Sequence, residues 1–163
     1  MLSPQEVNAF LSVPGPEPAV GEWPSAEQIP LSDEPKSNIS TVVTDLSTGK
    51  PLPRVHIAII PTDDWTTIPA YLRWGDWGRC PPPEFHVAAL RSWRDRYGAE
   101  LVGLGSNSMN LRIARQPATR AEALSLAREL YAYCPDLFLP GIQTYSTIAA
   151  ALMSRTWWNF WWG

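Results

Sequence analysis

The stretch PEFHVAALRSWRDRYGAELVGL, residues 83–104, combines a helix, its C-terminal stop and the strand that follows. Four of its residues recur at intervals of four, three and four, the spacing of one helix face: His86, Leu90, Trp93 and Tyr97. Proline is favoured in the first turn of a helix, and a glycine such as Gly98 commonly ends one. The stretch therefore predicts a helix over residues 83–97 that packs on a sheet through this face.

Strand-like segments lie on both sides of this helix. Residues 100–104 (ELVGL) and 109–114 (MNLRIA) flank a Gly-Ser-Asn turn and predict a hairpin. Two earlier segments are rich in β-branched residues and predict strands, 39–46 (ISTVVTDL) and 55–60 (VHIAII). The closing run at 156–162 (TWWNFWW) is rich in aromatic residues that favour strands.

Capping signals predict the remaining helices. Thr119 and Glu122 have the spacing of a capping box, and the helix behind them ends before Pro135. The face that we expect this helix to bury comprises Leu124, Ala127, Tyr131 and Cys134. A second, shorter helix is predicted over residues 144–153. Asp63 and Asp64 precede a short helix that Pro69 limits to a few turns, and we expect one of the two to cap it and the other to be solvated.

The order of these elements predicts an α+β fold. From residue 55 onward the chain runs strand, helices, strand, strand, helices, strand, which predicts a two-layer sandwich of an antiparallel sheet with helices on one face. This is the order of a ferredoxin-like split βαβ fold with a helix pair in each crossover. Alternation along the last strand separates its residues into two faces: Trp157, Asn159 and Trp161 on one, and Trp158, Phe160 and Trp162 on the other.

Composition divides the chain into two parts and limits its partners. Residues 1–38 contain seven prolines and predict an irregular N-terminal arm, whereas residues 39–163 predict a single α+β domain. The net charge of −3 gives no basic field for a nucleic-acid backbone, so we expect no nucleic-acid partner. The chain shows neither a secretory signal nor an apolar run of about 20 residues, so we expect a cytoplasmic protein without a membrane partner.

Several long motifs resemble one bacterial family. They are WGDWGRCPPPE (74–84), RYGAELVGL (96–104), EALSLARELYAYCPD (122–136) and WWNFWWG (157–163). Together these segments cover most of the regular part of the chain, and they resemble domain-of-unknown-function family 4253. Members of that family often end in Trp-Trp-Asp, whereas this chain ends in Trp-Trp-Gly. The resemblance implies no established chemistry for any residue.

Cys80, His86 and Asp136 are the candidate catalytic residues. A thiolate nucleophile needs a base within hydrogen-bond reach and a third group that orients the base. Cys80 precedes a predicted helix N-terminus, which stabilises a thiolate, and His86 lies in the first turns of that helix. The simpler interpretation is that all three have structural roles. Cys80 and Cys134 are too far apart in the sequence for a typical zinc motif, so we expect no metal and no cofactor.

Aromatic residues give the candidate binding surface. The chain contains nine tryptophans, and exposed aromatic clusters are typical of protein interfaces. The alternative for the last strand is a central position with both faces buried in the monomer. Arginines on the outer side of the 83–97 helix are either solvated or form a strip for a partner. The candidate binding residues are Trp74, Trp77, Arg91, Arg94, Trp158 and Trp162.

Three functions follow from these patterns. The first is a protein-binding module, whose most concrete form is an immunity protein that neutralises a toxin, by analogy with other small acidic bacterial proteins. The second is an enzyme or small-ligand binder with a Cys80/His86 centre. The third is a homo-oligomeric structural protein that is joined through its last strand. We therefore expect a protein partner, either another chain or a second copy.

Overall fold

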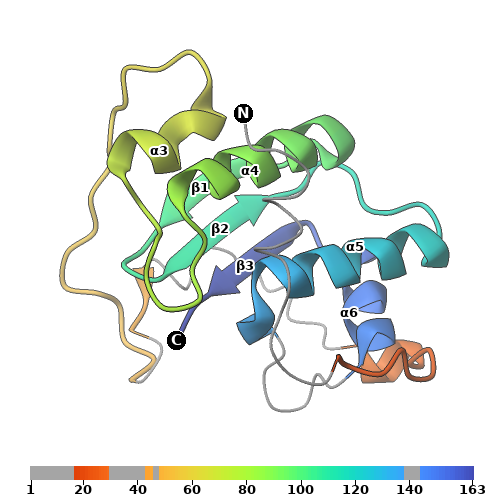
Figure 1. The fold of residues 1–163 in the computed structure, drawn as a ribbon. Helices are drawn as coiled ribbons and strands as arrows, with labels where there is room; N and C mark the ends of the chain where they lie inside the picture. Colours follow the sequence, from red (N-terminus) through yellow and green to blue (C-terminus); the bar gives the residue numbers. More distant parts are fainter. Residues whose placement is uncertain (1–16, 30–42, 46–47, 138–143) are drawn as a thin grey trace.

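The computed structural model describes residues 17–29, 43–45, 48–137 and 144–163. Within these ranges it contains four α-helices and a three-stranded sheet (Figure 1). The helices are α3 (Ile68–Leu72), α4 (Pro83–Tyr97), α5 (Arg120–Tyr133) and α6 (Tyr145–Leu152). The strands are β1 (Glu100–Leu104), β2 (Ser108–Arg112) and β3 (Trp157–Trp161). Short 3-10 helices are η1 (Ala26–Gln28), η3 (Trp65–Thr67) and η4 (Pro135–Leu137).

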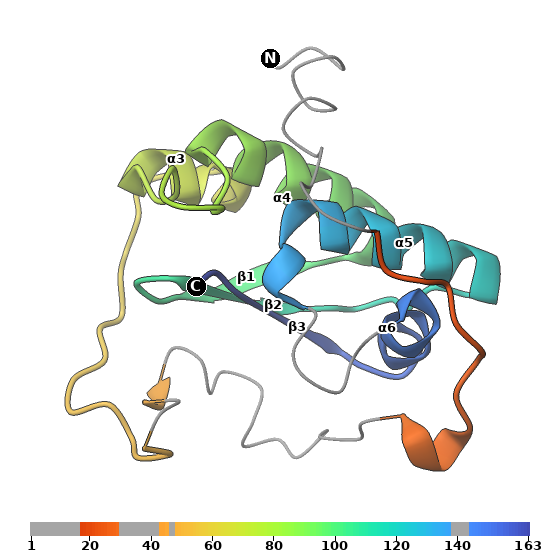
Figure 2. The same cartoon turned by 60° about the horizontal axis from the view of Figure 1, so that its bottom comes forward.

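The sheet is antiparallel, and its strands lie in the order β1-β2-β3. The helices α4 and α5 cover one of its faces, while α6 lies beside β3 and packs on α5 (Figure 2). This arrangement confirms the α+β class and a helical layer on one side of the sheet. The hairpin between β1 and β2 turns where the Gly-Ser-Asn sequence predicts it.

Helix α4 has the bounds that the sequence predicts. His86, Leu90, Trp93 and Tyr97 are its buried residues. Gly98 adopts a left-handed conformation with a φ of 60°, and its N–H donates to the carbonyl of Arg94 at 2.9 Å. Glycine takes this conformation without the steric cost that a Cβ would add. The spacing of apolar residues and the stop signal were therefore sufficient to place this helix.

Of the face predicted for helix α5, Ala127 and Cys134 are buried, but the rest of the buried face lies one position earlier along the helix. Its buried residues are Ala123, Leu126, Ala127, Leu130 and Tyr133. Leu124 and Tyr131, which were expected in the core, are half-buried. The reason is that α6 covers a second side of α5, where Tyr131 packs edge-on against Tyr145 with ring centroids 5.8 Å apart. Helix α5 thus packs against both the sheet and α6, and its buried residues are not confined to a single helix face.

The predicted strand over residues 55–60 is wrong. The segment belongs to no strand, and Ile57 and Ile59 are 97% and 94% exposed. A β-branched alternating sequence indicates a preference for pairing, but a strand also needs a neighbour. The split βαβ order lacks its first strand as a result. Most of the predicted 39–46 strand lies outside the described residues, and residues 43–45 form no strand.

Strand β3 separates its side chains as the alternation predicts. Trp158, Phe160 and the adjacent Trp162 are buried on the helical side, whereas Trp157 and Asn159 are half-buried and Trp161 is exposed. The ring of Phe160 stacks on Trp93 of α4, with centroids 5.4 Å apart and planes 5° apart. The last strand therefore contributes one side of the aromatic core, opposite α4.

Residues 17–29, the described part of the predicted arm, run along α6. The N–H groups of Tyr145 and Ser146 donate to the carbonyls of Ala19 and Val20 at 3.0 and 2.9 Å. The ring of Trp23 packs against the core and lies 4.5 Å from the guanidinium of Arg120. These contacts satisfy backbone groups at the start of α6, where a helix has no internal partners.

Replacing Gly98 by alanine should destabilise the fold more than the same change at Gly49. Both residues have positive φ, 60° and 67°, so both changes cost about 1 kcal/mol in backbone strain. At Gly98 a Cβ would also lie 2.9 Å from the Cβ of Ala114, whereas nothing lies within 4 Å at Gly49. We expect G98A to lower the free energy of unfolding by about 2–3 kcal/mol in denaturant titrations. Equal losses for the two variants would contradict this packing.

Candidate functional site

A loop between α3 and α4 brings two predicted binding residues against the core. The indole N–H of Trp74 donates to the carbonyl of Gly105 at 2.8 Å, and Trp77 packs edge-on against Trp74 at 5.1 Å. Gly75 has a φ of 115°, and a Cβ there would lie 2.2 Å from the carbonyl oxygen of Pro81. Only glycine therefore allows the loop to close this tightly, and Trp77 is held on a fixed base.

His86 is the centre of a buried cluster beneath this loop. Its Nε2 lies 3.5 Å from the sulfur of Cys80, and its Nδ1 lies 2.5 Å from the hydroxyl of Tyr133. The rings of Trp74 and Trp162 flank the imidazole at centroid distances of 4.8 and 5.7 Å. His86 has no exposed surface. The structure thus brings together Cys80 and His86, as the sequence predicts, inside an aromatic enclosure.

Burial keeps this cluster uncharged at neutral pH. It lowers the pKa of His86 to about 4, against an opposing hydrogen bond with the carbonyl of Pro81. It also raises the pKa values of Cys80 and Cys134 to about 12, and that of Tyr133 well above its usual range. A nucleophilic cysteine site needs a thiolate, usually beside a cationic group. The cluster has the distances of such a site without its charges.

The partners of Asp136 are Arg79 and the last residue of the chain, Gly163. The Asp136 carboxylate pairs with Arg79 and accepts from the N–H of Gly163 at 3.2 Å. The third group beside His86 is instead Tyr133, which the sequence analysis missed. The spacing of Leu126, Leu130 and Tyr133 also fits one helix face, and choosing that face would have placed Tyr133 in the core. In this structure the group that bonds to the Nδ1 of His86 is therefore Tyr133, and a role for Asp136 beside Cys80 and His86 stays a prediction.

Cys134 has its own partner and no metal site forms around it. Its thiol donates to the carbonyl of Trp161 at 3.2 Å, and both cysteines are free. In the ranges that the structure describes, no three or more His, Cys, Asp or Glu side chains are grouped closely enough to hold a metal ion.

Arg91 and Arg94 fasten the segment before α3 to α4. Both pair with the carboxylate of Asp64, at 3.0 and 3.2 Å. Asp64 also caps η3 by accepting from the hydroxyl and the N–H of Thr66. These hydrogen bonds, with Thr66 first and Arg91 after it, lower the pKa of Asp64. The two arginines thus have a structural partner within the chain, although the side chains of Arg91 and Arg94 stay 47% and 38% exposed.

The remaining candidate binding residues differ in accessibility. Trp158 and Trp162 are buried, because the alternation of β3 turns them toward the helices, so neither is available to a partner. Trp74 is half-buried under Trp77, and Trp77 keeps 36% of its surface exposed. Other apolar residues are more exposed than Trp77. They lie on the segment before η3 and on α3, two elements at one side of the molecule (Figure 1). These residues are Val55, Ile57, Ile59, Tyr71 and Leu72.

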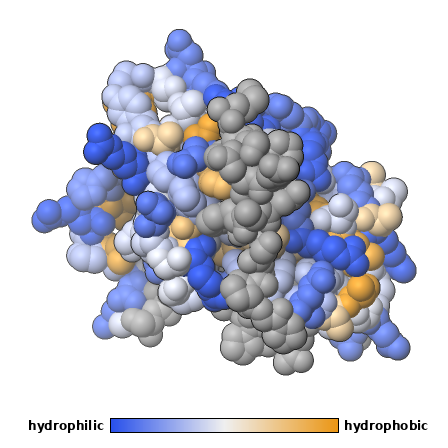
Figure 3. All heavy atoms as spheres, viewed as in Figure 1, coloured by the Kyte–Doolittle hydropathy of each residue, from blue (hydrophilic) through white to orange (hydrophobic). Residues whose placement is uncertain are grey.

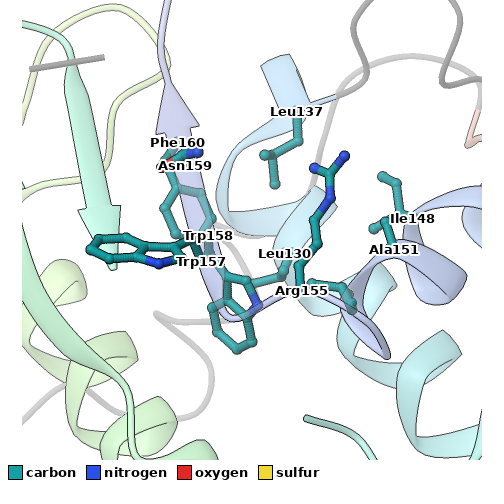
Figure 4. A pocket seen from close by; sticks show the side chains of 10 residues that line it. Leu130, Leu137, Ile148, Ala151, Arg155, Trp157, Trp158, Asn159 and Phe160 are labelled. Carbon is teal, nitrogen blue, oxygen red and sulfur yellow. The ribbon is translucent and has the colours of Figure 1, made fainter. Parts of the chain in front are cut away.

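A small cavity of about 100 Å³ lies between α5, α6 and β3 (Figure 4). Its walls are mainly apolar, and the side chain of Arg155 extends along it. The buried indole N–H groups of Trp158 and Trp162 have no acceptor among the described residues. The residues that line the cavity are Leu130, Leu137, Ile148, Ala151, Leu152, Arg155, Trp157, Trp158, Asn159 and Phe160.

Residues 56–163, about two thirds of the chain, match the family described as a domain of unknown function, DUF4253. The chain belongs to this family. The DUF4253 match includes the segment with Ile57 and Ile59, the His86 cluster and all three strands, and it begins after the described part of the arm. No curated protein and no solved structure matches the chain.

No helix in the described part of this DUF4253 protein is both long and apolar enough to cross a bilayer.

Acid should destabilise the protein through His86. Because the pKa of this imidazole falls from about 6.5 in the unfolded chain to about 4 in the fold, unfolding takes up a proton between these pH values. Stability is therefore full above pH 6.5 and is lost as the pH falls toward 4, by about 3 kcal/mol from this group alone. We expect a shallower pH dependence for H86Q in denaturant titrations. The variant H56Q, at an exposed histidine, should keep the wild-type slope.

Cys80 should react slowly with alkylating reagents. A thiol with a pKa of about 12 is almost entirely protonated near neutral pH, so alkylation should be on the order of a thousandfold slower than for an ordinary thiol. Peptide mass spectrometry after timed iodoacetamide treatment measures each cysteine separately. The same protein in denaturant provides the control rate. Rapid reaction of Cys80 in the folded protein, with a midpoint below pH 7, would restore the nucleophile hypothesis.

Proposed function

We propose that this DUF4253 domain is a protein-binding module whose contact element is the extended segment Val55–Ile60. The observation that carries the proposal is the nearly complete exposure of Ile57 and Ile59 in a segment that pairs with no strand. Burying an isoleucine side chain contributes about 1.5–3 kcal/mol, so two side chains favour association by several kcal/mol. Residues 56–60 of the segment lie inside the family match, and this part therefore belongs to the domain.

The backbone of the segment supports pairing with a strand. Extended segments that are rich in β-branched residues bind partners by adding a strand to a sheet, which satisfies backbone groups and places alternate side chains in contact. Val55, Ile57 and Ile59 share one side of such a strand. Pro53 and Pro61 bracket the segment and limit the ladder to the residues between them.

Trp77 supplies a second, preorganised aromatic contact in the loop before α4. Its ring rests on Trp74, which is itself fixed by a hydrogen bond to Gly105. Aromatic side chains that are already immobile lose little entropy on binding, which is one reason that tryptophan is frequent at interface centres. The face seen in Figure 3 is mostly hydrophilic, and its apolar areas are separated from one another. A narrow contact element is consistent with that surface.

The buried centre favours this proposal over an enzyme. Cys80 and His86 have the contact distance of a nucleophile and its base, but the raised pKa of the thiol and the lowered pKa of the imidazole keep both groups neutral. Toxin neutralisation is one form that a protein-binding module can take, and it stays a prediction from the sequence.

The variant I57K should abolish partner binding without unfolding the protein. Lysine at this exposed position leaves the core unchanged, whereas a buried charge in the interface is costly. The matched control is V20K, which adds the same charge at an exposed residue of the arm. We would capture the partner from lysate of the source organism, identify it, and titrate it in purified form against the three proteins. We expect at least a tenfold loss of affinity for I57K alone. Equal affinity for I57K and wild type would refute the proposal.

A further inference from the structure

The sheet has one open edge within the described residues. The backbone of β1 is hydrogen-bonded only to β2, and Val102 on this strand is 46% exposed. The opposite edge is partly covered, because η4 contacts β3 and the carbonyl of Trp161 accepts from Cys134. An exposed edge strand is a template for pairing with another chain.

The described part of the chain therefore contains two elements that could pair with each other, a strand-forming segment outside the sheet and the outer edge of β1. We propose that Val55–Ile60 of one copy pairs with the outer edge of β1 in a second copy, so that two copies exchange strands. This inference rests on the proposed function, since it names the partner of the same segment. The exchange gives each sheet a fourth strand, next to β1.

The two elements match in length and in the chemistry of their side chains. Six residues of the segment span about 20 Å and five residues of β1 about 17 Å, so the ladder can cover the whole edge. The added strand presents Val55, Ile57 and Ile59 on one face. With that face turned toward the helical layer, His56 and Ala58 remain on the solvent side. Val102, at the bulge in the β1–β2 register, is an exposed apolar side chain on this edge.

The direction of the segment favours a second copy over its own sheet. Its C-terminal end leads to η3, whose N-cap Asp64 is fixed to α4 by Arg91 and Arg94. In Figures 1 and 2 the segment leaves the helical layer and passes the end of the sheet, and it does not run beside β1. A reciprocal exchange uses the same two surfaces on each copy, so it closes as a two-fold dimer.

Cross-linking between single-cysteine additions tests the exchange. We would mix I57C with V102C under mild oxidation and expect a disulfide-linked species of twice the chain mass. Cys80 and Cys134 are buried and contribute little background. The matched control mixes V20C with V102C and should give no such species, because Val20 is exposed but lies on the arm. Circular dichroism of each variant confirms that it is folded.

Two outcomes would overturn the proposal. If the double variant I57C/V102C forms a disulfide within one chain and stays monomeric, the segment completes its own sheet. If wild type is monomeric at all concentrations in light scattering and the mixture does not cross-link, no exchange occurs. In that case the I57K titration tests the proposed function independently of the strand exchange. Binding of a different protein that I57K abolishes would leave the module intact with another partner, and no effect of I57K would remove both.

Discussion

The stacking of Trp93 on Phe160 joins parts of the chain that are far apart in sequence. The two rings lie 5.4 Å apart and nearly parallel, and Tyr133 packs edge-on against both at 4.8 and 5.2 Å. Through these three residues α4, α5 and β3 share one aromatic core. Aromatic pairs of this geometry contribute about 0.5–1.5 kcal/mol beyond the area that they bury. The position of β3, and with it the order of the sheet, depends on this contact.

The His86 cluster is an extension of the same core. Tyr133 connects the two, since its ring packs on Phe160 while its hydroxyl bonds to the imidazole. The surrounding rings that exclude water are also what keep His86 neutral, because no charged partner replaces the lost hydration. The burial that packs the cluster tightly therefore also keeps its thiol and imidazole uncharged and unreactive. Its hydrogen bonds fix the loop before α4, and this loop carries Trp77.

Local signals predicted those parts of the fold that depend on local structure. The bounds of α4 follow from apolar spacing and Gly98, and the two faces of β3 follow from alternation. What the sequence could not give is how many neighbours an element has. Helix α5 has a second neighbour in α6, which turns its buried face by one residue and brings Tyr133 to His86 in place of Asp136. The segment at 55–60 pairs with no strand in the described part of the chain, although its sequence predicts a strand equally well.

The two ends of the molecule therefore differ in a way that bears on function. At one end, residues 17–29 cover α6 and satisfy the backbone groups at its start, although they precede the family match. At the other end, residues 56–60 belong to the family match, and Ile57 and Ile59 among them are almost fully exposed. Apolar surface that a domain exposes at a fixed place is stabilised when another chain covers it. Because strand pairing adds backbone hydrogen bonds to that burial, the sheet edge of another chain is the surface that matches this segment best.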